Sequence, residues 1–129
     1  MNLLPVVLGP GTGARGRYLL DGWLHGQLGN GFPWGTFAAN ALGSLMIGLV
    51  FGLARRGSLP PAAMHFLAVG VLGGFTTFSA FTYETMRLLA NGSVGASFLN
   101  VAGQFAVGFV TVYPGFVAVR VLAGALTWR

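Results

Sequence analysis

The chain has 129 residues, of which 54% are hydrophobic and only 7% charged, and its mean hydropathy is +0.73. A soluble domain carries about 25% charged residues, so this composition excludes a surface that faces water throughout and indicates a membrane protein. The net charge of +5 comes from seven arginines that are scattered along the chain, which argues against a nucleic-acid partner, and the absence of cysteine excludes disulfides and thiolate chemistry.

Three apolar stretches, residues 34–54, 60–83 and 93–119, reach the length of about 20 residues that a helix needs to cross the hydrocarbon. The N-terminal segment is less apolar, because it contains glycines, a proline and charged side chains, yet we expect it to form a helix, bent or packed through its glycines, which brings the number of spans to four. We therefore predict an all-α membrane protein with one transmembrane domain over residues 1–129. The approximate spans are residues 3–24, 34–54, 62–86 and 95–122.

The arginines barely distinguish the two ends of such a four-span chain. The side that holds both termini carries Arg55, Arg56 and Arg129, and the other side carries Arg87 and up to two arginines of the first segment. This weak positive-inside bias permits insertion in both orientations. Because four short spans with many of the 22 glycines pack closely and enclose little interior, we also expect a partner chain.

Asn40, Arg17, Asn100 and Gln104 lie within the expected spans, and each has two interpretations. Asn40 could form an interhelical hydrogen bond or offer a donor to an aqueous cavity. Arg17 could extend to the membrane surface or anchor incoming anions. Asn100 and Gln104, one helical turn apart, could bond neighbouring helices or form a polar stripe.

The segment GGFTTFSAF, residues 73–81, combines glycines, hydroxyls and aromatic rings in the middle of an apolar span. Phe75, Phe78 and Phe81 recur at every third residue, which predicts that they share one flank of a helix. We expect Gly73–Gly74 to interrupt the helix. Irregular backbone at membrane depth survives only when it is buried in protein or lines a cavity, and broken helices often build ion sites. A purely structural kink is the alternative.

Three motifs in this chain resemble one known family. FPWGTFAANALGS (32–44), GGFTTFSAFTYE (73–84) and GARGRY (13–18) closely resemble the Fluc family of fluoride channels, also called CrcB. The resemblance covers most of the chain. It implies a four-helix, multi-pass protein of the bacterial plasma (inner) membrane, with a broken third helix, that forms an antiparallel, dual-topology homodimer.

The resemblance also implies roles for individual residues. The residues expected in the fluoride pore are Arg17, Asn40, Phe78, Ser79, Phe81, Thr82 and Gln104. In this arrangement the rings of Phe78 and Phe81 contact the permeating fluoride, and the side chains of Asn40, Ser79 and Thr82 replace its water.

A structural sodium ion at the dimer interface is the cofactor that the resemblance implies. The backbone carbonyls of Gly73 and Thr76, from both subunits, would hold it. The chain departs from the family in two places: Ala80 stands where Thr or Ser is usual, and Asn100 and Gln104 stand where the last span often has Tyr and Ser.

The expected function is therefore passive, fluoride-selective export that relieves fluoride toxicity. A proton-coupled exporter of the small multidrug type is the runner-up, but it needs a carboxylate within the membrane, and the two acids, Asp21 and Glu84, lie near span ends. We expect Glu84 to pair with Arg87. A non-transporting scaffold leaves the polar residues unexplained, and an enzyme is not expected, because no nucleophile or metal-ligand motif is present.

Overall fold

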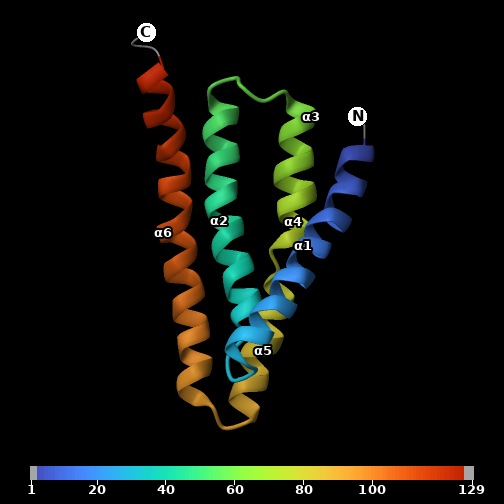
Figure 1. Ribbon diagram of the computed structural model, residues 1–129, viewed down its shortest axis with the longest axis vertical. Helices are drawn as coiled ribbons and strands as arrows, with labels where there is room; N and C mark the ends of the chain where they lie inside the picture. The colour runs from blue at the N-terminus through green and yellow to red at the C-terminus, as the bar shows by residue number, and fades with distance from the viewer. Residues whose placement is uncertain (1–2, 127–129) are drawn as a thin grey trace.

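The computed structural model describes residues 3–126, and these residues form four long helical segments without any strand. The first is α1 (Leu4–Leu28) and the second is α2 (Trp34–Arg55). The third, Pro61–Ala90, consists of α3 (Pro61–Met64), the π-helix η1 (His65–Leu72), α4 (Gly73–Phe75) and α5 (Phe78–Ala90). The last is α6 (Val94–Leu126). α2, α6 and the third segment stand side by side, and α1 crosses the third segment obliquely toward the N-terminal end of α2 (Figure 1).

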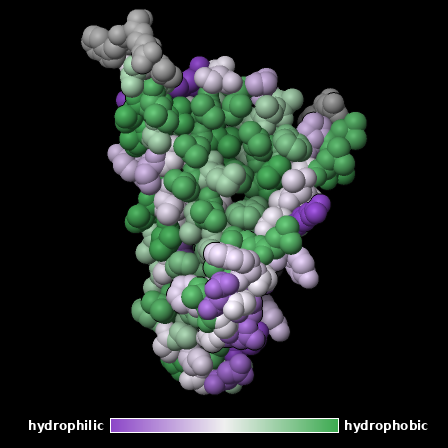
Figure 2. Space-filling model, in the orientation of Figure 1, coloured by the Kyte–Doolittle hydropathy of each residue, from purple (hydrophilic) through white to green (hydrophobic). Residues whose placement is uncertain are grey.

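Within residues 3–126, three segments are long and apolar enough to span a membrane: Trp34–Arg55, Pro61–Ala90 and Val94–Ala125. α1 has sufficient length but carries three charged residues, Arg15, Arg17 and Asp21. Many large apolar side chains point outward from the helices. On the face shown in Figure 2 they form a broad hydrophobic area, and hydrophilic residues gather toward the lower end. This surface suits a multi-pass membrane protein, since lipid tails can cover it.

α2 and α6 pack along most of their length because small residues remove the side chains between them. A Cβ atom at Gly48 would collide with the carbonyl of Val112, and one at Gly115 would collide with the carbonyl of Leu45. Gly52 continues this line of contact toward the C-terminal end of α2. We call Gly48, Gly52 and Gly115 the glycine seam; it brings the two backbones together, as small residues commonly do in membranes.

The third segment leaves the helical conformation at Thr76 and Thr77, not at Gly73–Gly74. Gly73 has φ −62° and ψ −34°, which are helical angles, whereas ψ is 155° at Thr76 and 124° at Thr77. The expected position of the interruption was therefore wrong. Gly74 instead allows close contact with the backbone of Pro10 on α1, and the hydroxyl of Thr77 caps α5 by accepting a hydrogen bond from the amide of Ala80 at 3.3 Å.

This position of the interruption also separates the three phenylalanines. Phe78 and Phe81 lie on α5, but Phe75 ends α4 and packs near Gly16 of α1 and Gly43 of α2. The prediction of one shared flank was therefore wrong for Phe75, because the extended residues between α4 and α5 reset the helical phase.

Candidate functional site

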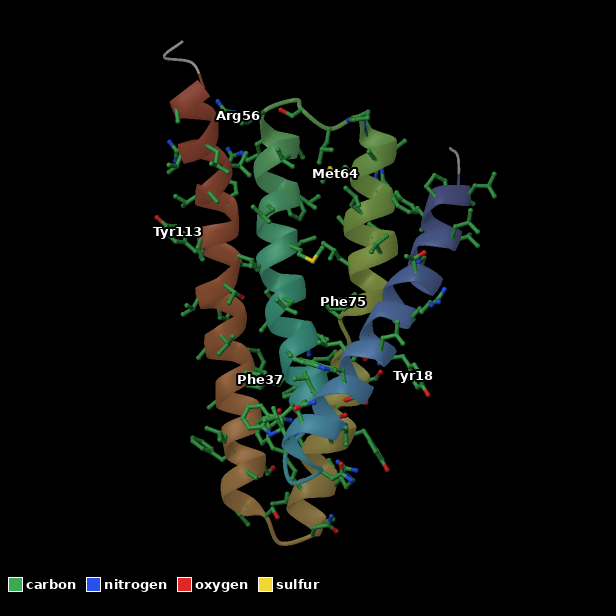
Figure 3. The ribbon with its side chains drawn as sticks, in the orientation of Figure 1. Tyr18, Phe37, Arg56, Met64, Phe75 and Tyr113 are labelled. Carbon is green, nitrogen blue, oxygen red and sulfur yellow. The ribbon has the colours of Figure 1, made fainter. Side chains whose placement is uncertain are left out.

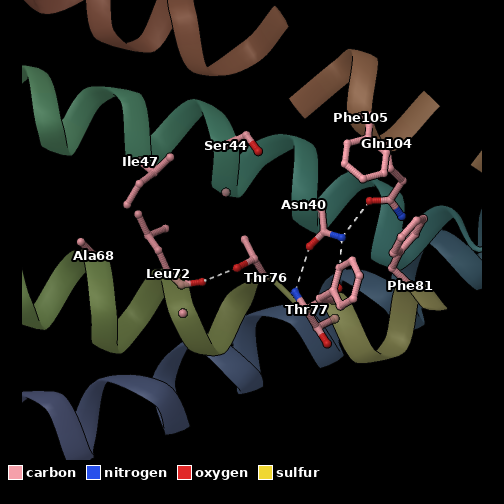
Figure 4. Close-up of a pocket in the computed structure, with 13 residues that line it drawn as sticks. Asn40, Ser44, Ile47, Ala68, Leu72, Thr76, Thr77, Phe81, Gln104 and Phe105 are labelled. Atoms are coloured by element: carbon pink, nitrogen blue, oxygen red, sulfur yellow. Dashed lines mark hydrogen bonds between the residues drawn. The ribbon is translucent and has the colours of Figure 1, made fainter. Parts of the chain in front are cut away.

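A cavity of about 390 Å³ opens beside the non-helical pair Thr76–Thr77. Residues of α2, the third segment and α6 line it, as Figure 4 shows. We call it the central cavity. Six of the residues singled out from the sequence line it: Asn40, Gly73, Thr76, Phe78, Phe81 and Gln104. Segments far apart in the sequence thus converge on one small space that combines amides, hydroxyls and aromatic rings.

Asn40 joins α2 to the non-helical pair through both ends of its amide. Its Oδ1 accepts a hydrogen bond from the backbone N–H of Thr77 at 2.9 Å, and its Nδ2 donates to the carbonyl of Thr77 at 3.2 Å. Thr77 is the N-cap of α5, so its carbonyl begins the hydrogen bonds of that helix, whereas its N–H takes no part in them. Asn40 supplies the partner that this buried N–H needs and adds a bond to the carbonyl, so this one side chain stabilises the interruption.

The same side chain begins a chain of polar contacts that runs along α6, which we call the amide chain. Asn40 Nδ2 also donates to Gln104 Oε1 at 2.8 Å, and Gln104 Nε2 donates to Asn100 Oδ1 at 3.3 Å (Figure 4 shows the first of these). Asn100 Nδ2 then donates to the hydroxyl of Thr85 on α5 at 2.9 Å. Because Asn100 is fully buried, with 0% of its surface exposed, it acts as an interhelical connector between α5 and α6.

Aromatic rings form the other wall of the central cavity. The rings of Phe78 and Phe81 are 5.6 Å apart between centroids, and Phe105 of α6 meets Phe81 edge-on at 6.3 Å and 84°. Phe81 is 7% exposed, whereas Phe78 is 71% exposed in the single chain. Ring edges carry partial positive charge, so the wall can present weak electropositive contacts to a small anion.

Three of the expected pore residues lie outside the lining of the central cavity. The hydroxyl of Thr82 donates to the carbonyl of Ser79 at 3.0 Å, and the hydroxyl of Ser79 lies 3.2 Å from that of Thr77. Both are local contacts of α5. Arg17 lies on α1, partly buried, with its Nε atom buried and without a hydrogen-bond partner among the described atoms.

Gly73 and Thr76 both reach the central cavity. The hydroxyl and the amide of Thr76 are bonded to the carbonyl of Leu72, at 3.0 and 2.9 Å. The described residues contain no cluster of His, Cys, Asp or Glu that could hold a metal. A cation at this place would therefore depend on backbone carbonyls.

The two acids lie apart from the central cavity. Glu84 accepts a hydrogen bond from the hydroxyl of Thr36 at 3.0 Å, and Asp21 lies 3.3 Å from His25 on α1. The expected pair between Glu84 and Arg87 was wrong: within the described part of the chain, the one contact of salt-bridge length joins His25 and Asp21. Thr36 of α2 is buried against α5 and takes the carboxylate instead.

Sequence reasoning missed Thr77, Thr85 and Phe105. Thr77 had a local signal, since a threonine that precedes a helix commonly caps its first turn. Thr85 and Phe105 had none, because their roles depend on which faces of α5 and α6 meet.

The fold and the cavity together define a helical, multi-pass membrane protein with a small polar and aromatic chamber between its helices. A sequence model of the family described as CrcB-like protein, Camphor Resistance (CrcB), matches residues 4–116. The chain belongs to this family.

Curated relatives share the name fluoride-specific ion channel FluC. One protein of Thermus thermophilus is 49% identical over 113 residues, which cover 88% of this chain and 89% of the relative. The protein of Geobacter sulfurreducens is 40% identical over 94% of this chain and 98% of the relative. That of Magnetococcus marinus is 39% identical over 95% of this chain and the whole relative.

Proposed function

We propose that the protein is a fluoride-selective ion channel that lets cytoplasmic fluoride leave the cell passively and so relieves fluoride toxicity. The relatives named fluoride-specific ion channel FluC support the substrate. The observation that carries the proposal is the central cavity, where the amides of Asn40 and Gln104 face the rings of Phe81 and Phe105. The proposed activity is permeation, not an enzymatic reaction.

The chemistry of this cavity suits a small, strongly hydrated anion. A wall that admits fluoride must replace its water with hydrogen-bond donors and polarised ring edges. Both N–H groups of Asn40 are occupied by Thr77 and Gln104 in the structure. An anion at this place therefore competes with the side-chain carbonyl of Gln104, and rotation of that amide would present its N–H group instead. Ser79, Thr82 and Arg17 are proposed to contact the ion along the path outside the cavity.

The direction of transport follows from the membrane potential. Hydrogen fluoride enters uncharged and dissociates inside the cell, and the trapped anion then leaves down its electrochemical gradient. An inside-negative potential contributes about 2.3 kcal/mol per charge for each 100 mV. The proposed location is therefore the bacterial plasma (inner) membrane. α1 would cross it as well, in addition to the three apolar segments.

An antiparallel, dual-topology homodimer would complete the site. The 71% exposure of Phe78 beside the buried Phe81 leaves one side of the aromatic wall open in the single chain, and a second copy could cover it. The weak arginine asymmetry permits both insertions. The third helix, broken at Thr76–Thr77, would then face its counterpart.

The same dimer would hold the proposed sodium ion. The residues fit in one respect: ψ of 155° at Thr76 turns its carbonyl away from the helical direction at the cavity wall, next to the turn that contains Gly73. One chain supplies only these two carbonyls, so two copies would be needed for four oxygen ligands. Bound there, sodium supplies a fixed positive charge near the anion path.

The contacts of the two acids argue against a proton-coupled drug exporter. Such an exporter needs a carboxylate in its substrate cavity, whereas neither Asp21 nor Glu84 lines the central cavity. A scaffold without transport leaves the polar and aromatic central cavity unexplained.

The central test is anion flux from liposomes, recorded with a fluoride electrode and compared with chloride. We expect fluoride efflux and no measurable chloride efflux. Phe81→Ile should abolish fluoride efflux, because it removes the ring at the centre of the aromatic wall, while the protein keeps its elution volume. Equal flux of both anions, or normal flux in the variant, would refute the proposal.

The sodium proposal has its own test. Extraction and gel filtration in potassium or N-methylglucamine buffers, compared with sodium buffers, should shift the protein from dimer to monomer as sodium is withdrawn. A dimer that is equally stable in all three buffers would exclude the site at Gly73 and Thr76.

A further inference from the structure

A second cavity, of about 410 Å³, lies at the C-terminal end of α2 and shares no residue with the central cavity. Gly52, Arg55, Arg56, Phe116 and Arg120 line it, and we call it the arginine pocket. Figure 3 shows Arg56 at the upper end of α2, beside α6. None of these residues has a role in the proposed permeation path.

The glycine seam explains why arginines from two helices meet here. A Cβ atom at Gly52 would lie 3.0 Å from the side chain of Val119, so α2 and α6 are in close contact just before α2 ends. Arg55 and Arg56 follow Gly52 within about one turn, and Arg120 follows Val119. The close packing therefore places the three guanidinium groups around one opening.

No described carboxylate neutralises these three charges. The chain has only two acids, and both are engaged elsewhere: Asp21 with His25, and Glu84 with Thr36. Arg56 donates one hydrogen bond to the carbonyl of Val119 at 3.2 Å, and Arg55 lies over the Phe116 ring at 5.7 Å. Since each guanidinium has five N–H donors, most donors in the pocket remain available to an anion.

The end of the apolar span Trp34–Arg55 predicts how deep the pocket lies in a bilayer. The span ends at the rim of the pocket, so we expect the opening at the boundary between hydrocarbon and headgroups. Phe116 adds an apolar wall below the charges. Guanidinium groups bind phosphate oxygens in bidentate fashion, and basic pockets between transmembrane helices recognise anionic headgroups.

We propose that the arginine pocket binds a phosphate group, and that its source is the headgroup of an anionic phospholipid. Arg55 of α2 and Arg120 of α6 donate hydrogen bonds to the phosphate oxygens from the two helices. Free phosphate offers the same chemistry, and the experiment must separate the two sources.

The test uses native mass spectrometry of the full-length, detergent-solubilised protein. Phosphatidylglycerol, phosphatidylcholine and inorganic phosphate are titrated separately. We expect retention of phosphatidylglycerol, with phosphatidylcholine and inorganic phosphate far weaker. The double variant R55Q/R120Q should weaken binding of phosphatidylglycerol roughly 25-fold, since each arginine near an anionic surface contributes about a fivefold factor.

The matched control is R15Q/R87Q, which removes two arginines that do not line the pocket. It should retain phosphatidylglycerol as the unmodified protein does. Arg120→Gln alone, an exposed change on α6, keeps the experiment decisive if the double variant misfolds, and it should weaken binding about fivefold. Equal weakening in the control, equal retention of phosphatidylcholine, or competition by millimolar inorganic phosphate would overturn the lipid assignment.

Discussion

The contact between α2 and α6 is made in two different ways along its length. Toward the C-terminal end of α2, the glycine seam brings the two backbones together, and apolar side chains fill the rest. Toward the N-terminal end of α2, Asn40 and Gln104 join the same two helices through hydrogen bonds. The seam requires only small side chains, while the amide chain requires particular groups at particular atoms.

This difference separates the region that stabilises the helix packing, the glycine seam, from the region that forms the candidate site, the amide chain. Dispersion contacts hold helices together in lipid without exposing a polar atom. Amides inside the membrane are costly unless every group has a partner, so they persist where they support a cavity. The central cavity lies beside the amide chain, and the seam provides the rigid frame.

The largest effect is expected from Asn40→Leu, which removes the amide that joins the amide chain to the non-helical pair Thr76–Thr77. It leaves the N–H of Thr77 without its partner and removes one of the bonds to its C=O. An unsatisfied backbone group in a membrane costs several kcal/mol, so we expect a sharp fall in melting temperature and loss of fluoride flux. Asn91→Leu, an exposed position after α5, is the matched control and should leave both unchanged.

A smaller effect is expected from Gly48→Ala, which attacks the seam. The new methyl group meets the carbonyl of Val112, and overpacking of this kind costs about 1–3 kcal/mol. Gly95→Ala is the control on α6, because nothing lies within 4 Å of its added Cβ. We expect a lower melting temperature for the first variant and selectivity for fluoride over chloride preserved in both. Loss of selectivity in Gly48→Ala would contradict the view that the glycine seam serves stability and not ion selectivity.

The smallest effect is expected from Asn100→Ala, at the far end of the amide chain. Interhelical hydrogen bonds in membranes average about 0.6 kcal/mol, and Asn100 makes two, with Thr85 and Gln104. Thr85→Val removes one of these bonds from the other side. The double variant should therefore cost less than the sum of the two single variants. If the losses of stability of the two single variants add up to that of the double variant in thermal unfolding, the amide chain does not act as a unit.

Much of the candidate site could be predicted from the sequence, because the family motifs place rare polar residues in apolar spans. Asn40, Phe81 and Gln104 were expected together and do meet in the central cavity. The structure shows the interhelical hydrogen bonds expected of Asn40, and its role as a donor to the cavity stays a prediction.

The remainder depended on packing that one helix cannot reveal. The glycines at 73 and 74 predicted a break, yet both remain helical and Gly74 provides close contact with Pro10 of α1. The partner of Glu84 lies 48 residues away on α2, not three residues along α5. Helical periodicity shows which residues of one helix share a face. It does not show which face of another helix packs against them, and that packing decides the partners of Gly74 and Glu84.

The bonds between Asn40 and Thr77 have a consequence for biogenesis. A segment with a peptide N–H that lacks a helical partner is poorly suited to enter the bilayer alone, and the N–H of Thr77 obtains its partner from a side chain 37 positions earlier. Because ribosomes release the chain from its N-terminus, Asn40 reaches the insertion machinery before the segment that needs it. Asn40 is therefore already present when the third segment is inserted. In a circular permutant that reversed this order, the third segment would have to insert without Asn40.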